Sequence, residues 1–173
     1  MLKSQLLASI LLATAVGASA QSQSTGVDAV PGGNEQDATA IRAKLTYSFE
    51  ESWNSHEPAK AVTPDKCVDD AVFINTTGGW IKGCQAVADL LTPLHAPGGR
   101  FHDHTRRHVV EDLRFIRPDV AIAVVKTLDI RIAGVPTLGR ETRGLVVLSK
   151  EGGLWKVTAS QNGTIQATPD GNR

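Results

Sequence analysis

The clearest pattern along the chain is a helical one between residues 34 and 54. Apolar side chains recur there at every fourth position, at Ile41, Leu45, Phe49 and Trp53. This spacing places one apolar stripe along a helix of about five turns. Asn34 suits the N-cap, with Asp37 as a weak capping-box partner, and Asn54 tolerates the left-handed conformation that ends helices. We therefore predict one long amphipathic helix at the start of the domain.

Proline and glycine delimit two shorter helices further along the chain. Pro58 suits the first turn of a second helix, which Pro64 interrupts, so that this helix is short or divides into two single turns. Gly83 precedes a third helix over about residues 84–92, which Pro93 stops. The pattern thus predicts about three helices in the N-terminal part of the domain.

The remaining pattern is that of β-strands. Residues 70–76 form a strand that is apolar on both faces up to Asn75, and Gly78-Gly79 supplies the turn after it. Because the helices come first in the chain, we predict an α+β domain with the helices packed on one face of a curved antiparallel sheet. Four further strands are expected at residues 101–116, 120–132, 141–149 and 154–161, the first of them long or bulged.

The two ends of the chain lack these patterns. Residues 1–20 resemble a secretory signal, with Lys3 before an apolar run and a small-residue site that predicts cleavage after Ala20. An uncleaved N-terminal anchor is the alternative. Residues 21–33 are expected to be a flexible leader and 164–173 a flexible tail, which leaves 34–163 as the domain. We therefore expect a periplasmic or secreted protein without a membrane segment after cleavage.

Charge and cysteine content narrow the function classes. Loss of Lys3 with the signal lowers the basic side chains from 18 to 17 against 18 acidic ones, a net charge of −1. Such a balance favours neither nucleic acid nor an anionic membrane as a partner. In an oxidising compartment, Cys67 and Cys84 are free to form a disulfide, and two buried thiols are the alternative.

Several short segments together resemble the SgcJ/EcaC group of the SnoaL-like proteins, in the nuclear transport factor 2-like superfamily. The resemblance covers about residues 37–163 and depends on the order and spacing of the segments rather than on one motif. The segments are Trp53-Asn54-Ser55-His56, Asp69 to Asn75, Gly78 to Gly83, Arg117 to Ala121, Gly153 to Val157 and Gln161-Asn162.

The resemblance implies a cone-shaped α+β half-barrel, often dimeric through its sheet, with a pocket at the open end. It also implies an oxidoreductase-like label, yet the sequence has no dinucleotide fingerprint or flavin motif, so that no cofactor is expected. Ketosteroid isomerases share this fold, but Asn75 stands where they carry the aspartate base, and Phe49 where they carry the tyrosine acid. An amide takes no proton at neutral pH, and ketosteroid-isomerase chemistry is therefore not expected.

Strand alternation suggests which side chains line the pocket. Trp155, Val157, Ala159 and Gln161 would share one face of the last strand. The expected pocket is apolar with a few polar groups, as small-molecule sites are, and is lined by Phe73, Asn75, Trp80, Thr127 and Gln161. Trp80 follows two glycines and would fold over the pocket mouth, although a surface position or a dimer contact is as plausible. The alternative is that these side chains simply fill the core.

Histidines are the candidates for proton transfer. His56 and His102 are expected to move protons while Asn75 and Gln161 polarise a carbonyl group, so that these four are the catalytic candidates. His102, His104 and His108 would share a strand face, and with His56 or Asp103 they raise the alternative of a zinc site. The spacing is nonspecific for zinc, and a solvated edge strand without metal is the expectation.

Two functions remain open at this point. The first is binding of a small hydrophobic molecule in the pocket, with weak catalysis as an extension of it. The second is a non-catalytic homodimer that binds a protein or peptide. An enclosed cavity that reaches Asn75 and Gln161 would favour the first function, whereas a solidly packed cone with Trp80 on the surface would favour the second.

Overall fold

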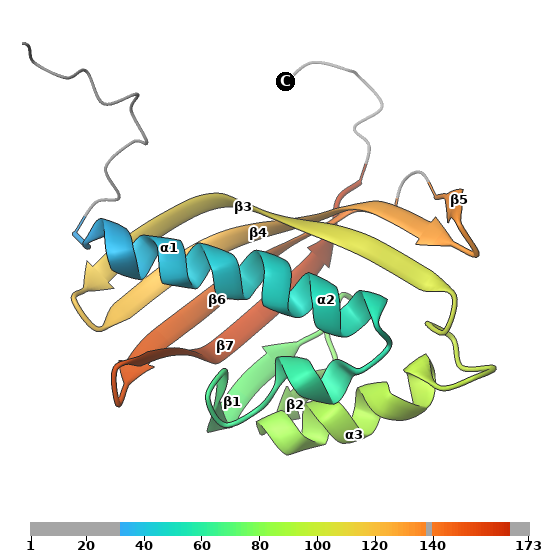
Figure 1. The fold of residues 1–173 in the computed structure, drawn as a ribbon, viewed down its shortest axis with the longest axis horizontal. Helices are drawn as coiled ribbons and strands as arrows, with labels where there is room; N and C mark the ends of the chain where they lie inside the picture. The colour runs from blue at the N-terminus through green and yellow to red at the C-terminus, as the bar shows by residue number, and fades with distance from the viewer. Residues whose placement is uncertain (1–31, 138–139, 167–173) are drawn as a thin grey trace, which may run out of the picture.

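The computed structural model describes residues 32–137 and 140–166 of the chain. The expected signal peptide, most of the leader and residues 167–173 of the tail lie outside this part. The described residues form an α+β domain in which helices pack against one face of a strongly curved sheet (Figure 1). The predicted α+β class is confirmed. The predicted number of helices and the purely antiparallel sheet are wrong.

The long N-terminal helix is present and continuous. It consists of α1 (Glu35–Ala43), a π-helical segment η1 (Lys44–Ser48) and α2 (Phe49–Asn54). Asn34 caps it as predicted, because its Oδ1 accepts the backbone N–H of Asp37 at 2.8 Å and its Nδ2 donates to the Asp37 carboxylate at 2.8 Å. Apolar residues spaced every fourth position drift around a helix of 3.6 residues per turn, and the wider π turn reduces that drift.

The number of helices is corrected from three to two. The second predicted helix is only a single 3₁₀ turn, η2 (Pro58–Ala61). The other helix, α3 (Cys84–His95), does not stop at Pro93 but continues through it to His95. Pro93 is exposed in the last turn, where the missing N–H removes a single helical bond. Within the described residues, no helix is long and apolar enough to cross a membrane.

The sheet is mixed rather than purely antiparallel. Its path is β2-β1-β7-β6-β4-β3, with β5 paired to β4, and β1 runs parallel to β7. The other neighbouring strands are antiparallel. The bounds are β1 (Cys67–Ile74), β2 (Trp80–Lys82), β3 (His104–Arg117), β4 (Val120–Ile132), β5 (Val135–Pro136), β6 (Thr142–Glu151) and β7 (Leu154–Thr164).

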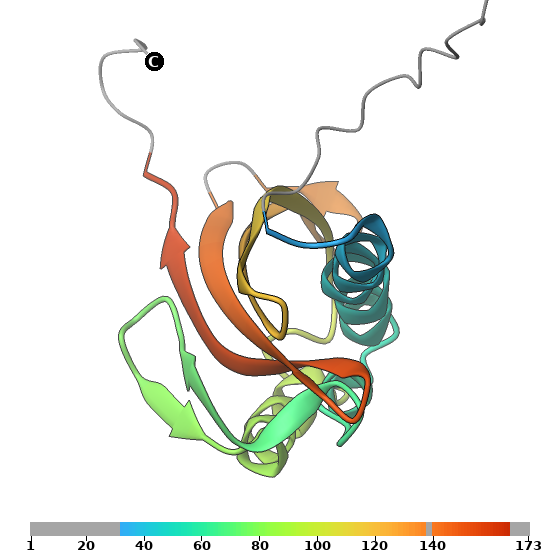
Figure 2. The ribbon, with the colours of Figure 1, turned by 90° about the vertical axis from the view of Figure 1, so that its left-hand side faces the viewer.

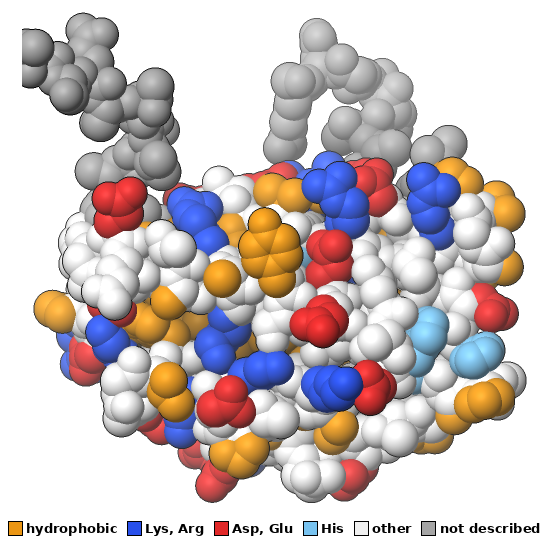
Figure 3. Space-filling view, in the orientation of Figure 1, with side chains coloured by type: hydrophobic (Ala, Val, Ile, Leu, Met, Phe, Trp, Pro, Cys, Tyr) orange, Lys and Arg blue, Asp and Glu red, His pale blue; other side chains and the backbone are white. Residues whose placement is uncertain are grey.

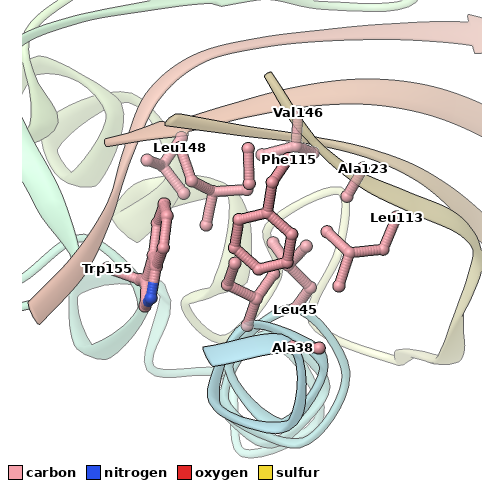
Figure 4. Close-up of a cluster of buried hydrophobic side chains, with 11 residues drawn as sticks. Ala38, Leu45, Leu113, Phe115, Ala123, Val146, Leu148 and Trp155 are labelled. Carbon is pink, nitrogen blue, oxygen red and sulfur yellow. The ribbon is translucent and has the colours of Figure 1, made fainter. Parts of the chain in front are cut away.

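The main core lies between the long helix and the inner face of the sheet. Ile41 and Leu45 of the helix and Leu148 of β6 are fully buried. Around them, Phe115 and Trp155 meet edge to face, with ring centroids 5.4 Å apart (Figure 4). Viewed end-on, the sheet curls around the long helix, and α3 packs at one side of this arrangement (Figure 2). The opposite, outer face of the sheet is not covered by any described helix.

Polar side chains of the long helix cover the free edge of β3. Asn54 accepts the backbone N–H of Arg106 at 2.9 Å and donates to its carbonyl at 3.0 Å, as a neighbouring strand would. Glu50 accepts the backbone N–H of His108 at 2.9 Å, and Arg42 donates to the carbonyl of Val110 at 3.4 Å. An exposed strand edge is a site for pairing with other chains, and these bonds satisfy it internally. They also fix the register of the helix against His104 to Val110.

A disulfide joins Cys67 of β1 to Cys84 at the start of α3. The two sulfurs lie in a second, smaller core with Val68 and Ala71, all four residues being buried. The disulfide, which the sequence left open, therefore anchors the N-terminal end of α3 to the sheet. The C-terminal end of the same helix carries His95.

Candidate functional site

The predicted site residues separate into two groups. Asn75 lies at the turn between β1 and β2, where it is exposed. Its Oδ1 accepts three hydrogen bonds, from the backbone N–H of Thr77 at 3.0 Å, the Thr77 hydroxyl at 2.8 Å and the backbone N–H of Gly79 at 3.0 Å. The amide that was expected to line a pocket thus holds its own turn together. It does not point into the core.

Gln161 lies on the outer face of the sheet, and the prediction that it shares a face with Trp155 and Val157 is wrong. Val157 pairs with Leu148 and Ala159 pairs with Val147, so that Thr158 is an extra residue in β7. Such a bulge moves every later side chain to the opposite face. Ala159 and Gln161 therefore point away from the core. Gln161 borders a shallow hollow of about 470 Å³ on the outer face, together with Val124 and Leu145.

The other expected pocket residues lie in different surroundings. Phe73 is half-buried and packs against both cores. Thr127 is buried on the inner face, beside His108 in the pairing of β4 with β3. Trp80 is 67% exposed and pairs with Ile74, on the outer face. Trp80 therefore covers no pocket mouth.

The two catalytic histidine candidates do come together, at the end of the molecule where α2, α3 and the start of β3 meet. The rings of His56 and His102 have centroids 5.5 Å apart. Histidine side chains are visible together at this end of the surface (Figure 3). We call this region the histidine end; its side chains are Trp53, His56, His95, Phe101, His102, His104 and Arg106.

His95 is the centre of the histidine end, and the sequence analysis missed it. It is 2% exposed, and its Nδ1 lies 3.3 Å from Nδ1 of His56, so that one ring donates and the other accepts. Its backbone carbonyl lies 3.3 Å from Nδ1 of His102. His95 continues the buried stripe of α3 formed by Cys84 and Ala88 at helical spacing. Extending that stripe past Pro93 would have found it.

Arg106 supplies a positive charge at the histidine end, on a half-buried side chain whose Nε atom is fully buried. Its guanidinium carbon lies 3.4 Å from the centroid of the Trp53 ring, a cation–π contact. Burial lowers the pKa of Arg106 to about 9, which still leaves it charged at neutral pH. Within the described residues no carboxylate forms an ion pair with it.

His95, His104 and His108 favour the neutral form. Burial, with a smaller effect from His56 and Arg106, lowers the pKa of His95 to about 4. Burial and Arg106 lower the pKa of His108 to about 3. The pKa of His104 is also lowered, mainly by burial. A neutral imidazole has one N–H donor and one acceptor nitrogen, so that these rings can take part in hydrogen bonds while Arg106 carries the positive charge.

Buried nitrogen atoms without partners are concentrated in this region. In the described part of the chain, five buried side-chain atoms have no hydrogen-bond partner, and four of them are Trp53 Nε1, His95 Nε2, Arg106 Nε and His108 Nδ1. The fifth is the Thr63 hydroxyl. Each such group costs about 1–3 kcal/mol, so that their grouping is unusual for a purely structural core. Within residues 32–137 and 140–166, no three His, Cys, Asp or Glu side chains are arranged to hold a metal ion.

Comparison with known proteins shows the fold but no family. No protein-family profile matches the chain, and no curated protein matches it. A domain of unknown function from Nostoc punctiforme, described as cystatin-like, superposes with a TM-score of 0.68 at 19% identity, over 78% of this chain and 80% of that one. This chain has a cystatin-like fold.

Two further structures place this cystatin-like fold in a wider group. A nuclear transport factor 2-like protein with a cystatin-like fold from Novosphingobium aromaticivorans has a TM-score of 0.60 at 15% identity, over 78% of this chain and 85% of that one. A hexachlorocyclohexane dehydrochlorinase from Novosphingobium barchaimii has a TM-score of 0.61 at 17% identity, over 80% and 92%. The cystatin-like, nuclear transport factor 2-like fold is therefore used by an enzyme as well as by proteins of unknown function.

Proposed function

We propose that this chain is an exported, homodimeric domain of the SnoaL-like, SgcJ/EcaC type, which associates with a second copy of itself through the outer face of its sheet. The observation that carries the proposal is a continuous apolar surface on that face. Two observations favour an interaction domain over a ligand pocket. Trp80 is on the surface, and the described hollows do not reach Asn75. An interaction function is therefore better supported than a pocket lined by Asn75 and Gln161.

The apolar surface consists of two cross-strand rows. In the first row, side chains lie side by side across five strands, with Gln161 the single polar member among Trp80, Ile74, Leu145 and Val124. The second row, two residues along each strand, contains Val72, Ala159, Val147 and Ile122. We call these eight apolar side chains the apolar face.

Exposure and rim charges support a role in association. Trp80 is 67% exposed and Leu145 45% exposed, although large apolar side chains gain by burial. The first row ends at Asp112, which pairs with Val124. The second row has Lys82 at one end and Arg114 at the other. An apolar centre with a charged rim is typical of protein interfaces. A patch that faces its own copy across a two-fold axis gives a closed dimer.

The experiment is to measure the mass in solution by sedimentation equilibrium. The domain is expected to be a dimer, and Leu145→Glu is expected to be a monomer because it places a charge in the apolar face. Leu154→Glu is the matched control, since Leu154 is 50% exposed but is the first residue of β7, outside the apolar face. A wild-type monomer at high concentration, or equal effects of the two variants, would contradict the proposal.

Export is supported by the disulfide between Cys67 and Cys84, since disulfides persist mainly in oxidising compartments. The expected mature chain begins at Gln21. Intact-mass measurement of the protein recovered from its native compartment tests both points together. A mass that includes residues 1–20, or two free thiols, would contradict export with cleavage.

A second candidate function is the binding of a small hydrophobic molecule, with weak oxidoreductase-like catalysis as implied by the SgcJ/EcaC resemblance. One observation favours it: His56 and His102, from separate elements, lie with ring centroids 5.5 Å apart. Native mass spectrometry of the exported protein tests it. A retained small molecule would support this function, and a bare protein mass would count against it.

A further inference from the structure

The histidine end holds a set of hydrogen-bond donors that no described residue uses. The Nε–H of Arg106 and the Nε1–H of Trp53 can only donate, and both are buried without a partner in the described part of the chain. His95 is 2% exposed, and its Nε2 is equally unpartnered; it is a donor in the tautomer whose Nδ1 accepts the N–H of His56. The group that would satisfy these atoms is an acceptor, and the charge of Arg106 favours an acceptor that is negative.

Contacts between the rings place three of these donors together. The Trp53 and His95 rings have centroids 4.3 Å apart and are perpendicular. Arg106 stacks on the Trp53 ring, with its guanidinium carbon 3.4 Å from the ring centroid. The carboxylate of Glu50, on α2, accepts the backbone N–H of His108 at 2.9 Å. The three donor side chains therefore form one cluster around the guanidinium of Arg106.

The segment Ala96–Asp103 covers these donors. Phe101 in this segment packs on Trp53 at 5.0 Å, on His95 at 5.7 Å and on His104 at 5.4 Å, between ring centroids. The segment has no regular secondary structure, and it contains Gly98 in a left-handed conformation, at φ 79°. Between its ends, which are held by Ala96 N–H to the Thr92 carbonyl and by Ala133 N–H to the Asp103 carbonyl, the segment has one described backbone bond to the preceding helix, from Phe101 N–H to the Leu94 carbonyl at 2.7 Å.

We propose that the segment Ala96–Asp103 opens to admit a small organic oxyanion, which accepts hydrogen bonds from Arg106, Trp53 and His95. Phe101 is the plug that leaves when the anion enters. The aromatic surroundings favour a planar organic body on the anion, such as an aromatic carboxylate, because the rings of Trp53 and His95 remain in the site when Phe101 leaves. The proposal deepens the second candidate function by naming the site and the ligand class. It does not depend on association through the apolar face.

The experiment follows the indole N–H signals in ¹H–¹⁵N spectra while benzoate is added. The three tryptophans give three such signals, and a Trp53→Phe variant assigns the relevant one. Benzoate is expected to move the Trp53 signal to saturation at millimolar concentration. The signals of Trp80 and Trp155 serve as internal controls, because Trp80 is on the outer face and Trp155 already donates to Asp37 at 2.9 Å.

Variants separate the role of charge from that of the covering segment. Arg106→Gln is expected to weaken benzoate binding by about tenfold or more, since it removes the charge. Arg107→Gln is the matched control, because Arg107 is exposed and pairs with Asp129 at 3.0 Å, and it is expected to change binding by less than about twofold. Phe101→Ala is expected to tighten binding severalfold and keeps Arg106 in place.

The outcomes that would overturn the proposal are distinct from those that test dimerisation. Benzamide, the neutral analogue, should leave the Trp53 signal in place, and equal shifts with benzamide would refute an anion site. A response to inorganic phosphate without a response to benzoate would refute an organic ligand. No Trp53 shift in either the wild type or Phe101→Ala would refute the site itself, whatever the sedimentation result.

Discussion

Lys150 and Asp37, 113 residues apart in the sequence, form an ion pair at 2.8 Å that closes one end of the core. Asp37 is 8% exposed, and Trp155 and Asn34 also donate to it, at 2.9 Å and 2.8 Å. The pKa of Asp37 is lowered, mainly by the bond from Lys150. One carboxylate thus links the first turn of the long helix to β6 and β7.

Asp37→Ala is expected to lower the free energy of unfolding by about 2 kcal/mol, because it leaves the buried Trp155 N–H and Lys150 without their acceptor. Chemical denaturation at neutral pH measures this change. Asp119→Asn is the control, since the Arg117–Asp119 pair is exposed and should contribute less than about 0.5 kcal/mol. Similar losses in both variants would show that the burial of Asp37 does not matter.

Acid is expected to destabilise the domain from about pH 6.5 downward. The pKa of His95 is lowered from 6.5 to about 4 and that of His108 to about 3, so that the unfolded chain binds protons in this range while the folded chain does not. For His95 the loss is on the order of 3 kcal/mol by pH 4. The lowered pKa of Asp37 adds a further loss only below its ordinary value of 3.8.

Two measurements check this pH dependence. Unfolding midpoints between pH 7 and 4 should decline less steeply in His95→Gln, which has no proton to bind in the unfolded chain. The ring signals of His95 should titrate near pH 4 in the folded protein. Titration near 6.5 would contradict a buried neutral ring at the histidine end.

Loss of the Cys67–Cys84 disulfide is expected to cost about 3 kcal/mol, as the chain-entropy account gives for a loop with a sequence separation of 17. The double variant Cys67→Ala and Cys84→Ala measures this by denaturant unfolding against the oxidised wild type. Reduced wild type should match the double variant. If all three were equally stable, the bridge would contribute nothing to the anchoring of α3.

Asn75→Ala is expected to destabilise the domain by about 1 kcal/mol, since the Asn75 Oδ1 accepts three hydrogen bonds in the turn before β2. Asn75→Asp keeps the acceptor and should be near wild type, which thermal unfolding can compare. Greater mobility of Trp80 in Asn75→Ala is the accompanying spectroscopic sign. Equal loss in both variants would mean that the amide N–H₂ group, rather than the oxygen, is what the turn needs.

The long helix and most strands could be predicted because their signals are local. The four-residue spacing from Ile41 and the cap at Asn34 depend only on neighbours in sequence. The parallel pairing of β1 with β7 could not be predicted this way, since it joins residues about ninety positions apart. Helices placed before the strands suggested a simple antiparallel order.

The candidate site was predicted only in part, for two physical reasons. Alternation along β7 assigned Gln161 to the inner face, but one bulged residue at Thr158 reverses the alternation, and nothing in its own sequence marks it. The rule that proline ends a helix concealed His95, two positions after Pro93. His56 and His102 were found because their chemistry, rather than their position, singled them out.

The way in which the long helix covers β3 has a consequence for behaviour at high concentration. Asn54, Glu50 and Arg42 occupy backbone groups of Arg106, His108 and Val110, so that another molecule cannot add a strand along this half of β3. At the other end of the strand path lies β2, which has only three residues. Edge-to-edge growth into fibrils therefore meets an edge that is half occupied at one end of the sheet and a strand too short to hold a template at the other.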